Sequence, residues 1–498
     1  MRTKTHLRVG NRRRRAAANS GAIGATRRRD PEYTARALVE ALWRGLGGAV
    51  ASLLLAALAL SLAPTQALAI PSFARQTGQP CAACHTAFPE LTPFGRRFKL
   101  GGYTLEGGDS KIPPIAAVVQ TTFTEYARKL DAPTGTYTPV SPGGGFGDNN
   151  FGDLGQQVSL FYGGKIYGNV GAFIQTTYAN DYGRVFGLDN TDIRYANTGT
   201  IGNLDMVYGV TVNDNPTVQD VWNTTPAWRF PFINSNFALS PATATMLESF
   251  GPGETTGVGG YVFAHDIVYA ELSGYGSLTP RAQTTLGDCC GSTTINGVAP
   301  YWRLAVEPNW GDNSLMVGTF GMTASVLPGG VPGIGDDRIT DIGIDSQYQW
   351  IGDVHAITLR GSYIYEKQQL NATFPSGGSA NPNNDLRSLN LSASYIYDHT
   401  ISLTAAFFQL AGSADAITYA NNANFSPNSQ GYMVDLAYLP FSHGAPGPWP
   451  WVNARIGVSY TWWTRFDGGT SDIDPVQCPG CRSAKDNNTL LLYAFTAF

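Results

Sequence analysis

Short segments in which apolar and polar residues alternate with a period of two recur along most of the chain. In the segment 386–397, Leu, Ala and Tyr side chains take every second position from Leu389, and Asn and Ser side chains stand between them. The segment 355–366 alternates Ile, Leu and Tyr with Thr, Arg, Ser and Glu in the same way. A period of two is the pattern of a β-strand with one apolar and one polar face. The chain from 113 onward is therefore predicted to be all-β.

The number and spacing of these segments predict a barrel. Sixteen segments are predicted to be strands: 114–126, 156–165, 168–178, 190–197, 203–212, 256–264, 267–276, 300–308, 313–325, 337–349, 355–366, 386–397, 400–411, 429–439, 451–465 and 487–498. Connections after odd-numbered segments are mostly long, and those after even-numbered segments are mostly short. Short turns at one end and long loops at the other are the layout of outer-membrane barrels. We expect residues 113–498 to form a porin-like antiparallel barrel of about 16 strands, apolar outside and polar towards an aqueous lumen; a large soluble all-β domain is the alternative.

Two features of the predicted loops leave alternatives open. The long connection 213–255 contains Trp222, Trp228 and several Pro residues, and either folds inward to narrow the pore or stays at the surface. The predicted outer loops also contain four cysteines, Cys289, Cys290, Cys478 and Cys481. In an oxidising compartment they are expected to form two disulfides, whose connectivity the sequence does not give. A metal or iron–sulfur site is the alternative.

The composition supports an exported β protein and excludes other classes. Only 14% of the 498 residues are charged, against about 25% in a typical soluble domain. The mean hydropathy is nevertheless −0.12, so the chain lacks the several long apolar runs of a helical membrane bundle. Aromatic residues make up 12%, too many for a disordered chain, and the charge is too sparse for a coiled coil.

Residues 1–69 are predicted to be a signal peptide. They contain 12 basic and 3 acidic residues, and the arginine clusters Arg12–Arg15 and Arg27–Arg29 precede an uncharged Leu/Ala-rich run from 45 to 63. Ala67-Leu68-Ala69 follows as a cleavage signal, so the mature chain is expected to begin near Ile70. A nucleic-acid-binding patch is the alternative for the arginines, and a membrane anchor is the alternative for the apolar run. The remaining 21 basic and 34 acidic residues modestly favour cations over anions.

The strongest chemical signal is Cys81-Ala82-Ala83-Cys84-His85. C-x-x-C-H is the attachment signature of haem c, in which two cysteines form thioethers and the adjacent histidine ligates the iron. Cys81, Cys84 and His85 are therefore predicted to bind one covalent haem c, with His85 as an axial ligand. A thioredoxin-like redox pair and half of a zinc site are the alternatives. The other C-x-x-C, at Cys478 and Cys481, has no adjacent histidine.

The segment 70–112 that carries this motif is too short to fold as an ordinary cytochrome domain, and is predicted to be a small haem-bearing plug. Six apolar residues are expected to pack on the porphyrin: Phe73, Phe88, Leu91, Phe94, Phe98 and Leu100. Four basic residues are candidates for its propionates, with solvated surface charge as the alternative: Arg75, Arg96, Arg97 and Lys99. Three acidic residues, Glu90, Glu106 and Asp109, are expected either to hold a cation transiently or to be solvated.

The sixth ligand of the iron is not evident in the sequence. No Met and no second His occurs between His85 and Met206, so the iron is either five-coordinate or completed by the downstream domain. The residues from which such a ligand would come are His265, His355, His399, His443, Met206 and Met316. The sequence selects none of them.

Residues 71–78, the C-x-x-C-H motif and Phe88-Pro89-Glu90-Leu91-Thr92-Pro93-Phe94-Gly95-Arg96-Arg97-Phe98-Lys99 together resemble the fused outer-membrane cytochrome–porin family. The resemblance is dense over 71–105 and elsewhere rests on the barrel layout and on phrases such as 213–228. It implies one haem c, held by Cys81, Cys84 and His85, a sixteen-stranded porin, and electron transfer across the outer membrane. In the best-known members the donor is extracellular Fe(II) and the acceptor is a periplasmic electron carrier.

The resemblance and the barrel layout together give a functional expectation. The protein is expected in the outer membrane of a Gram-negative bacterium, with its haem in the periplasmic mouth or the lumen. It would pass electrons from Fe(II) or another small reductant to a periplasmic cytochrome or copper protein, and no nucleic acid is expected as a partner. Whether it is an Fe(II)-oxidising enzyme stays open. A diffusion porin with a haem-containing plug and a haem protein that binds a small ligand are the alternatives.

Overall fold

The computed structural model describes residues 72–108, 112–128, 150–179, 186–249, 254–287, 293–444, 449–475, 479–480 and 482–498. The predicted signal peptide, the four loop cysteines and Asp109 lie outside these residues. The predictions made for them therefore stay predictions.

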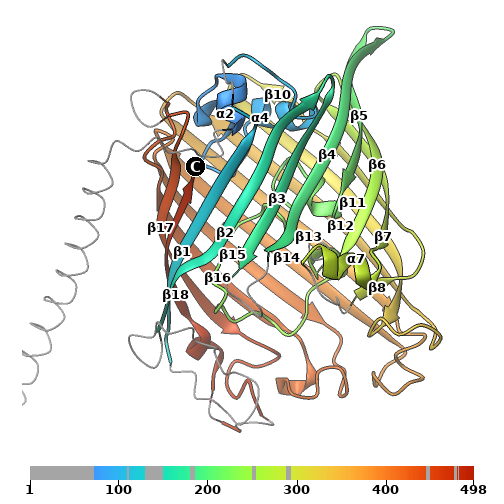
Figure 1. Ribbon diagram of the computed structural model, residues 1–498. Coiled ribbons are helices and arrows are strands. Elements are labelled where there is room, and N and C mark those ends of the chain that lie inside the picture. Colours follow the sequence, from blue (N-terminus) through green and yellow to red (C-terminus); the bar gives the residue numbers. More distant parts are fainter. Residues whose placement is uncertain are drawn as a thin grey trace, which may run out of the picture. The chain divides into compact units, whose positions relative to one another are not determined.

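Within the described residues, sixteen strands of eight or more residues form one closed antiparallel sheet (Figure 1). They are β1 (Ile115–Tyr126), β2 (Asn150–Tyr167), β3 (Val170–Ala179), β4 (Phe186–Ile201), β5 (Leu204–Asn213), β6 (Thr255–Ala264), β7 (Val268–Ser277), β9 (Ala299–Val306), β11 (Asn313–Pro328), β12 (Asp337–Ile351), β13 (His355–Gln369), β14 (Asn383–Tyr397), β15 (Ile401–Gly412), β16 (Ser429–Tyr438), β17 (Asn453–Arg465) and β18 (Thr489–Ala497). Two short strands, β8 (Thr293–Ile295) and β10 (Asn309–Trp310), both pair with β11. The barrel closes where β1 pairs with β18, with Val118 opposite Ala497. The prediction of a barrel of sixteen strands is confirmed.

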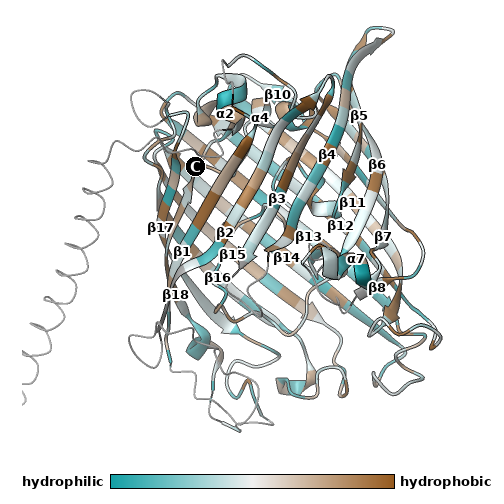
Figure 2. Ribbon diagram, viewed as in Figure 1, coloured by the Kyte–Doolittle hydropathy of each residue, from teal (hydrophilic) through white to brown (hydrophobic). Residues whose placement is uncertain are grey.

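Apolar side chains face outward from this barrel, and polar side chains face the lumen. In β13 and β14, Leu359 and Tyr395 are exposed on the outer surface, whereas Thr358 and Ser394 are buried inside. Figure 2 shows apolar residues interspersed with polar ones along the strands. Lipid offers no partner to backbone N–H and C=O groups, and a closed sheet pairs them all. The chain is therefore a porin-like transmembrane barrel of the outer-membrane type, as the sequence predicts.

The N-terminal segment lies at the end of the barrel where the short turns are. It contains three helices, α2 (Ser72–Thr77), α3 (Cys81–Cys84) and α4 (Pro93–Leu100), which appear at the upper end in Figure 1. Thr92 starts α4, because its hydroxyl accepts a hydrogen bond from the backbone N–H of Gly95 at 3.2 Å and Pro93 has no N–H to leave unpaired. We call residues 72–108 the plug. Outer-membrane barrels keep their short turns in the periplasm, so the plug belongs to the periplasmic end.

The long connection between β5 and β6 folds into the lumen, which resolves the alternative left open by the sequence. Residues 213–225 of this inward loop are buried without exception. The loop contains two single-turn helices, α5 (Pro216–Gln219) and α6 (Met246–Ser249). Its apolar residues Trp222, Met246 and Leu247 join clusters with inward-facing residues of β5–β13. The core thus lies between the inward loop and one half of the barrel wall. None of the described helices is long and apolar enough to cross a membrane.

Candidate cofactor site in the lumen

The three residues of the C-x-x-C-H motif line a cavity inside the barrel. Cys81 and Cys84 are the first and last residues of α3, and His85 follows directly. The cavity has a volume of about 400 Å³ and is lined by the plug, the inward loop and the strands β1, β2, β3, β4, β17 and β18. That volume lies within the range of about 300–1,000 Å³ that is typical of ligand and cofactor sites. The structure therefore places the motif against a cavity within the barrel, at its short-turn end.

The wall of this cavity is largely apolar and aromatic. Its aromatic residues come from all three parts of the molecule: Phe73, Phe88, Phe98, Tyr103, Phe161, Phe173, Trp228, Phe232 and Phe495. Of the six residues expected to pack on the porphyrin, Phe73, Phe88, Leu91 and Phe98 line the cavity. Phe94 is instead 42% exposed, and Leu100 is buried against Trp222 of the inward loop. The sequence analysis named Trp228 only as part of the long connection and did not name Phe232, because their place in the cavity depends on the inward fold of the loop.

His85 is held in a form that can ligate a metal. Burial lowers the pKa of its imidazole to about 4, although the backbone of Pro89 and Glu90 acts in the opposite direction. Its ring meets the edge of Phe88 with centroids 5.3 Å apart, and its Nδ1 atom is buried without a hydrogen-bond partner. The imidazole is thus neutral at neutral pH, which is the protonation state of a metal ligand.

The two thiols do not have the properties of a redox pair. Burial raises the pKa of Cys81 to about 11, and burial together with Cys81 raises the pKa of Cys84 to about 12. Thioredoxin-like pairs work with a cysteine whose pKa is lowered. Among the described residues, no group of three or more His, Cys, Asp or Glu side chains is arranged to hold a metal ion, so no zinc site is assembled there either. Covalent attachment of haem is the interpretation of the motif that these surroundings fit.

Arg75 has two donors for which the chain supplies no acceptor. Its side chain is only 4% exposed, its Nη2 donates to the carbonyl oxygen of Ile115 at 2.5 Å, and its guanidinium lies over Trp451 at 5.2 Å. Its Nε and Nη1 are buried without a partner, and burial lowers the pKa of the group. Buried N–H groups without acceptors are uncommon in native proteins. They fit an anionic group of a cofactor, although Arg75 is not among the residues that line the cavity.

The other three predicted propionate partners fasten the plug to the rest of the protein. Arg96 is buried and pairs with Glu307, and its Nη1 also donates to Gln349 Oε1 at 2.7 Å. Lys99 lines the cavity, but its Nζ donates to the carbonyl oxygens of Val218 and Asp220 in the inward loop. Arg97 pairs with Asp266 in the turn between β6 and β7. The guanidinium of Arg96 is thus committed to the barrel wall and does not line the cavity.

Two arginines that the sequence analysis did not single out line the cavity, Arg229 of the inward loop and Arg455 on β17. Arg455 on β17 donates to the carbonyl oxygen of Phe88 at 2.8 Å and pairs with Asp435 at 2.9 Å. It stands at an inward-facing position of its strand. A charged residue on the lumenal face of a predicted strand was the only signal that the sequence offered for it.

The acidic residues of the plug pair with basic side chains of the barrel. Glu90 is fully buried and pairs with Arg360 at 2.8 Å, and it accepts hydrogen bonds from Thr86 and Ser394, both at 2.9 Å. Burial alone would raise the pKa of Glu90, but Arg360 and these hydroxyls hold it below its usual value. Glu90 was expected either to hold a cation transiently or to be solvated at the surface. Its full burial and its ion pair with Arg360 contradict both expectations. Glu106 pairs with Lys165 at 2.5 Å near the surface.

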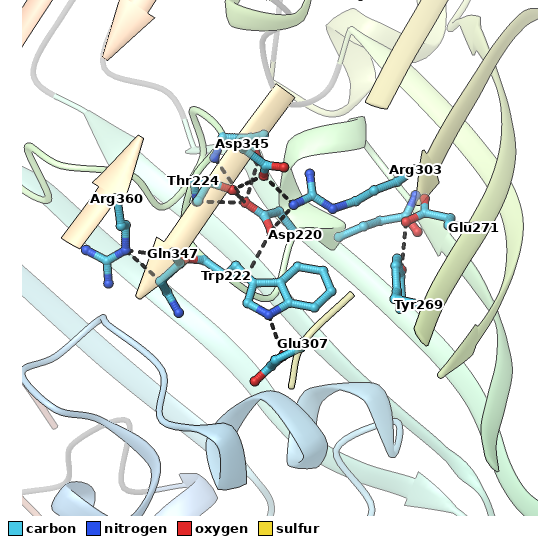
Figure 3. Close-up of polar contacts among 12 residues, drawn as sticks. Asp220, Trp222, Thr224, Tyr269, Glu271, Arg303, Glu307, Asp345, Gln347 and Arg360 are labelled. Carbon is cyan, nitrogen blue, oxygen red and sulfur yellow. Dashed lines mark hydrogen bonds and ion pairs between the residues drawn. The ribbon is translucent and has the colours of Figure 1, made fainter. Parts of the chain in front are cut away.

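A polar network joins the inward loop to the barrel wall (Figure 3). Asp220 accepts backbone hydrogen bonds from Trp222 at 2.9 Å and Thr224 at 2.9 Å, which closes a tight turn. Arg303 of β9 pairs with Asp345 of β12 and lies 3.6 Å from Asp220. The indole of Trp222 donates to Glu307 Oε2 at 2.6 Å. Because Glu307 also pairs with Arg96, plug, loop and wall form one connected unit.

None of the six residues considered as a sixth iron ligand lines the cavity. His355 contacts the hydroxyl of Tyr395 at 2.7 Å, His399 contacts the carbonyl oxygen of Thr86 at 3.0 Å, and His443 pairs with Asp398 at 3.3 Å. Met316 is buried in the cluster around Trp222. His265 lies in a turn, with φ 58°, and Met206 lies on β5. The structure selects no sixth ligand from this group.

No protein-family model and no curated protein matches the sequence. Solved structures that are similar to it include the outer-membrane channel DcaP of Acinetobacter baumannii, at 16% identity and TM-score 0.42, covering 79% of this chain and 100% of that one. An anion-selective porin from Comamonas acidovorans has 10% identity and TM-score 0.42, covering 77% and 98%. The outer-membrane protein OmpT of Vibrio cholerae has 11% identity and TM-score 0.38, also covering 77% and 98%. Similarity at this level says nothing of what this chain binds or carries.

Proposed function

We propose that this porin-like barrel holds one covalent haem c in its lumenal cavity and carries electrons across the outer membrane. The donor would be extracellular Fe(II) or another small reductant, and the acceptor a periplasmic cytochrome or copper protein. The observation that supports this most directly is that Cys81, Cys84 and His85 line a cavity within the barrel. When bound, a haem supplies a one-electron redox centre whose potential depends on its ligands and surroundings.

The position of the cavity suits transfer between two aqueous phases. The apolar band of an outer-membrane barrel is about 25 Å tall, too far for efficient tunnelling from a single centre at one rim to a donor at the other. A centre within the lumen shortens the distance to a donor that enters from outside. The plug carries the motif from the short-turn end, so the same centre stays close to a periplasmic acceptor.

Each part of the wall has a definable task. Cys81 and Cys84 would hold the cofactor by thioethers, and the neutral imidazole of His85 would ligate its iron. The aromatic wall excludes water from the haem and lowers the local dielectric constant. A low dielectric constant disfavours the more highly charged oxidation state of the haem, so the wall influences its reduction potential. Arg75 does not line the cavity, but its unpartnered Nε and Nη1 would offer charge-assisted hydrogen bonds to a carboxylate of the cofactor that extends beyond the wall.

A diffusion porin is the second candidate. It is favoured by the barrel itself, whose lumen contains a second cavity of about 270 Å³ towards the long-loop end. In this function the plug would only narrow or stabilise the pore. A haem protein that binds a small ligand is compatible with the same cavity, since none of the six proposed sixth ligands lines it.

The proposal is tested by expressing the chain in a host that attaches haem c and purifying it from outer membranes. We expect a haem that stays bound under denaturing conditions and is reduced by Fe(II) without oxygen. Cys81→Ala combined with Cys84→Ala should abolish covalent haem, and His85→Ala should abolish reduction while the barrel still forms channels in planar bilayers. Phe94→Ala, an exposed position on α4, is the control. Absence of covalent haem, with unchanged solute permeation, would overturn the conduit in favour of the porin.

A further inference from the structure

Two cavities follow one another along the lumen. The cofactor cavity reaches Asn453 and Arg455 near the short-turn end of β17. The second cavity reaches Ser459 and Thr461 farther along the same strand, towards the long-loop end. Residues 229, 231 and 233 of the inward loop line both cavities. The two cavities therefore adjoin at this short stretch of the loop.

The inward loop packs against the opposite side of the lumen. Residues 213–225 of the inward loop are buried against β5–β13, and the network of Figure 3 fixes them there. The second cavity is instead enclosed by β14–β18 and by the loop segment 229–248. The second cavity thus forms a route from the long-loop end of the barrel to the cofactor cavity. This route runs along β14–β18.

An ion pair stands where the cavities meet. Arg229 donates from Nη1 to Glu248 Oε1 at 2.6 Å. Ser388 of β14 donates to the same oxygen at 2.8 Å, and Thr245 donates to Oε2 at 3.0 Å. The side chain of Glu248 is 5% exposed and that of Arg229 is 24% exposed. Glu248 is therefore the more buried and more fully hydrogen-bonded partner, and Arg229 is the more exposed one.

These two side chains dominate the charge of the second cavity. Among the described residues that line it, Arg229 and Glu248 are the only charged ones; the others are apolar or carry hydroxyl and amide groups. Together the pair presents no net charge. Loss of either partner would leave one full charge in a confined space with low-dielectric walls, where its effect on a passing ion is large.

We propose that the second cavity is the entry route of the electron donor, and that the Arg229–Glu248 ion pair determines which charge of donor reaches the cofactor cavity. The donor that fits is a small hydrated divalent cation such as Fe(II), whose water shell can hydrogen-bond to the hydroxyl and amide lining. On arrival, Fe(II) loses one electron to the ferric haem and leaves as Fe(III), and no bond forms or breaks. The identity of the donor rests on the proposed function, whereas the route does not.

Two opposite substitutions test the pair in the holoprotein. Glu248→Gln leaves Arg229 uncompensated, so at low ionic strength reduction by Fe(II) should slow by about threefold or more and reduction by ascorbate, an anion, should accelerate. Arg229→Gln should do the reverse. The variant with both substitutions should return close to the wild type. Arg97→Gln, which breaks an ion pair at the short-turn rim, is the matched control and should change neither rate.

A second measurement needs no haem. In planar bilayers under a KCl gradient, Glu248→Gln should shift the reversal potential towards anion selectivity, and Arg229→Gln towards cation selectivity. Ser459→Trp, which fills the second cavity, should lower the conductance in the same bilayer measurement. In the haem-loaded protein it should also lower the rate of reduction by either donor. Unchanged selectivity in both single variants, with unchanged rates in Ser459→Trp, would overturn the route. If selectivity shifts but Fe(II) does not reduce the wild type, the route stands and the proposed function fails.

Discussion

Arg96 on the plug helix α4 and Glu307 on the barrel wall form a buried ion pair. Their side chains are 2% and 3% exposed. Glu307 also accepts a hydrogen bond from the indole of Trp222, at 2.6 Å. One wall carboxylate therefore holds both the plug and the inward loop. Removing one partner of such a pair leaves a buried charge without compensation, which typically costs about 3–5 kcal/mol.

We expect Glu307→Gln to destabilise the plug by about 3–5 kcal/mol, because the amide keeps an acceptor for Trp222 but leaves the Arg96 guanidinium unpaired. Hydrogen exchange of the backbone amides in 72–108 measures the free energy of local opening in the folded barrel. Exposed ion pairs contribute only about 0–1 kcal/mol, so Arg97→Gln should leave this exchange nearly unchanged.

The same measurement separates charge from packing. Replacing Arg96 and Glu307 together by Met removes both charges, and apolar replacement of a buried pair is often close to neutral. The double variant should therefore lose less stability than Glu307→Gln, even though it also removes the acceptor of Trp222. A double variant that is less stable than the single one would show that the pair does more than compensate its own charges.

A prediction about iron ligation follows from the lining of the cavity. His355, His399 and His443 have partners elsewhere and do not line it. Replacing each of them by Ala should therefore leave the absorption and electron paramagnetic resonance spectra of the haem unchanged, whereas His85→Ala should alter both. The ferrous protein is expected to bind carbon monoxide. A spectral change in any of the three distal variants would identify that histidine as a ligand.

Arg75 gives a prediction whose sign depends on whether a cofactor is present. In the haem-free protein Arg75→Met removes the hydrogen bond to Ile115 and the contact with Trp451, but also two buried donors without acceptors, so the net loss of stability should be small, about 1 kcal/mol or less. In the haem-loaded protein the same substitution removes a cation near an anionic group. The ferric state is then less disfavoured, and the reduction potential should fall. Redox titration of the variant against Arg97→Gln checks this, and equal potentials would exclude Arg75 from the cofactor.

The strands could be predicted from the sequence because the membrane imposes their pattern locally. A residue on a transmembrane strand faces either lipid or lumen, so alternation appears within each segment, and all sixteen predicted segments match strands in the structure. The C-x-x-C-H signal is equally local, since its spacing alone predicts haem attachment, which stays a prediction. Its place inside the lumen is not local, because it depends on the plug, the inward loop and the wall closing around it.

The partners of charged side chains could not be predicted from the sequence. Arg96 and Glu307 are 211 positions apart, and Glu90 and Arg360 are 270 positions apart. Nothing near Arg96 or Glu90 in the sequence distinguishes a wall anchor from a cofactor contact or a solvated charge. The inward loop was ambiguous for a similar reason, since Trp and Pro residues suit both a surface loop and one packed against a wall. These outcomes depend on which strands the closed barrel brings opposite one another.

Gly95 tests how closely α4 must approach the cysteine helix α3. A Cβ atom at this position would lie 2.3 Å from the carbonyl oxygen of Cys84, closer than any side chain tolerates. On helix propensity alone, Gly→Ala inside a helix is stabilising by about 0.5–1 kcal/mol. Because backbone atoms cannot yield as a flexible side chain can, we expect Gly95→Ala to destabilise the plug by about 1–3 kcal/mol instead. The yield of covalent haem and hydrogen exchange in 72–108 should both report it, with Phe94→Ala as the neighbouring control. If Gly95→Ala stabilised the plug instead, α3 and α4 would be able to move apart without cost. The contact between the two helices would then not be what holds the cysteines in place.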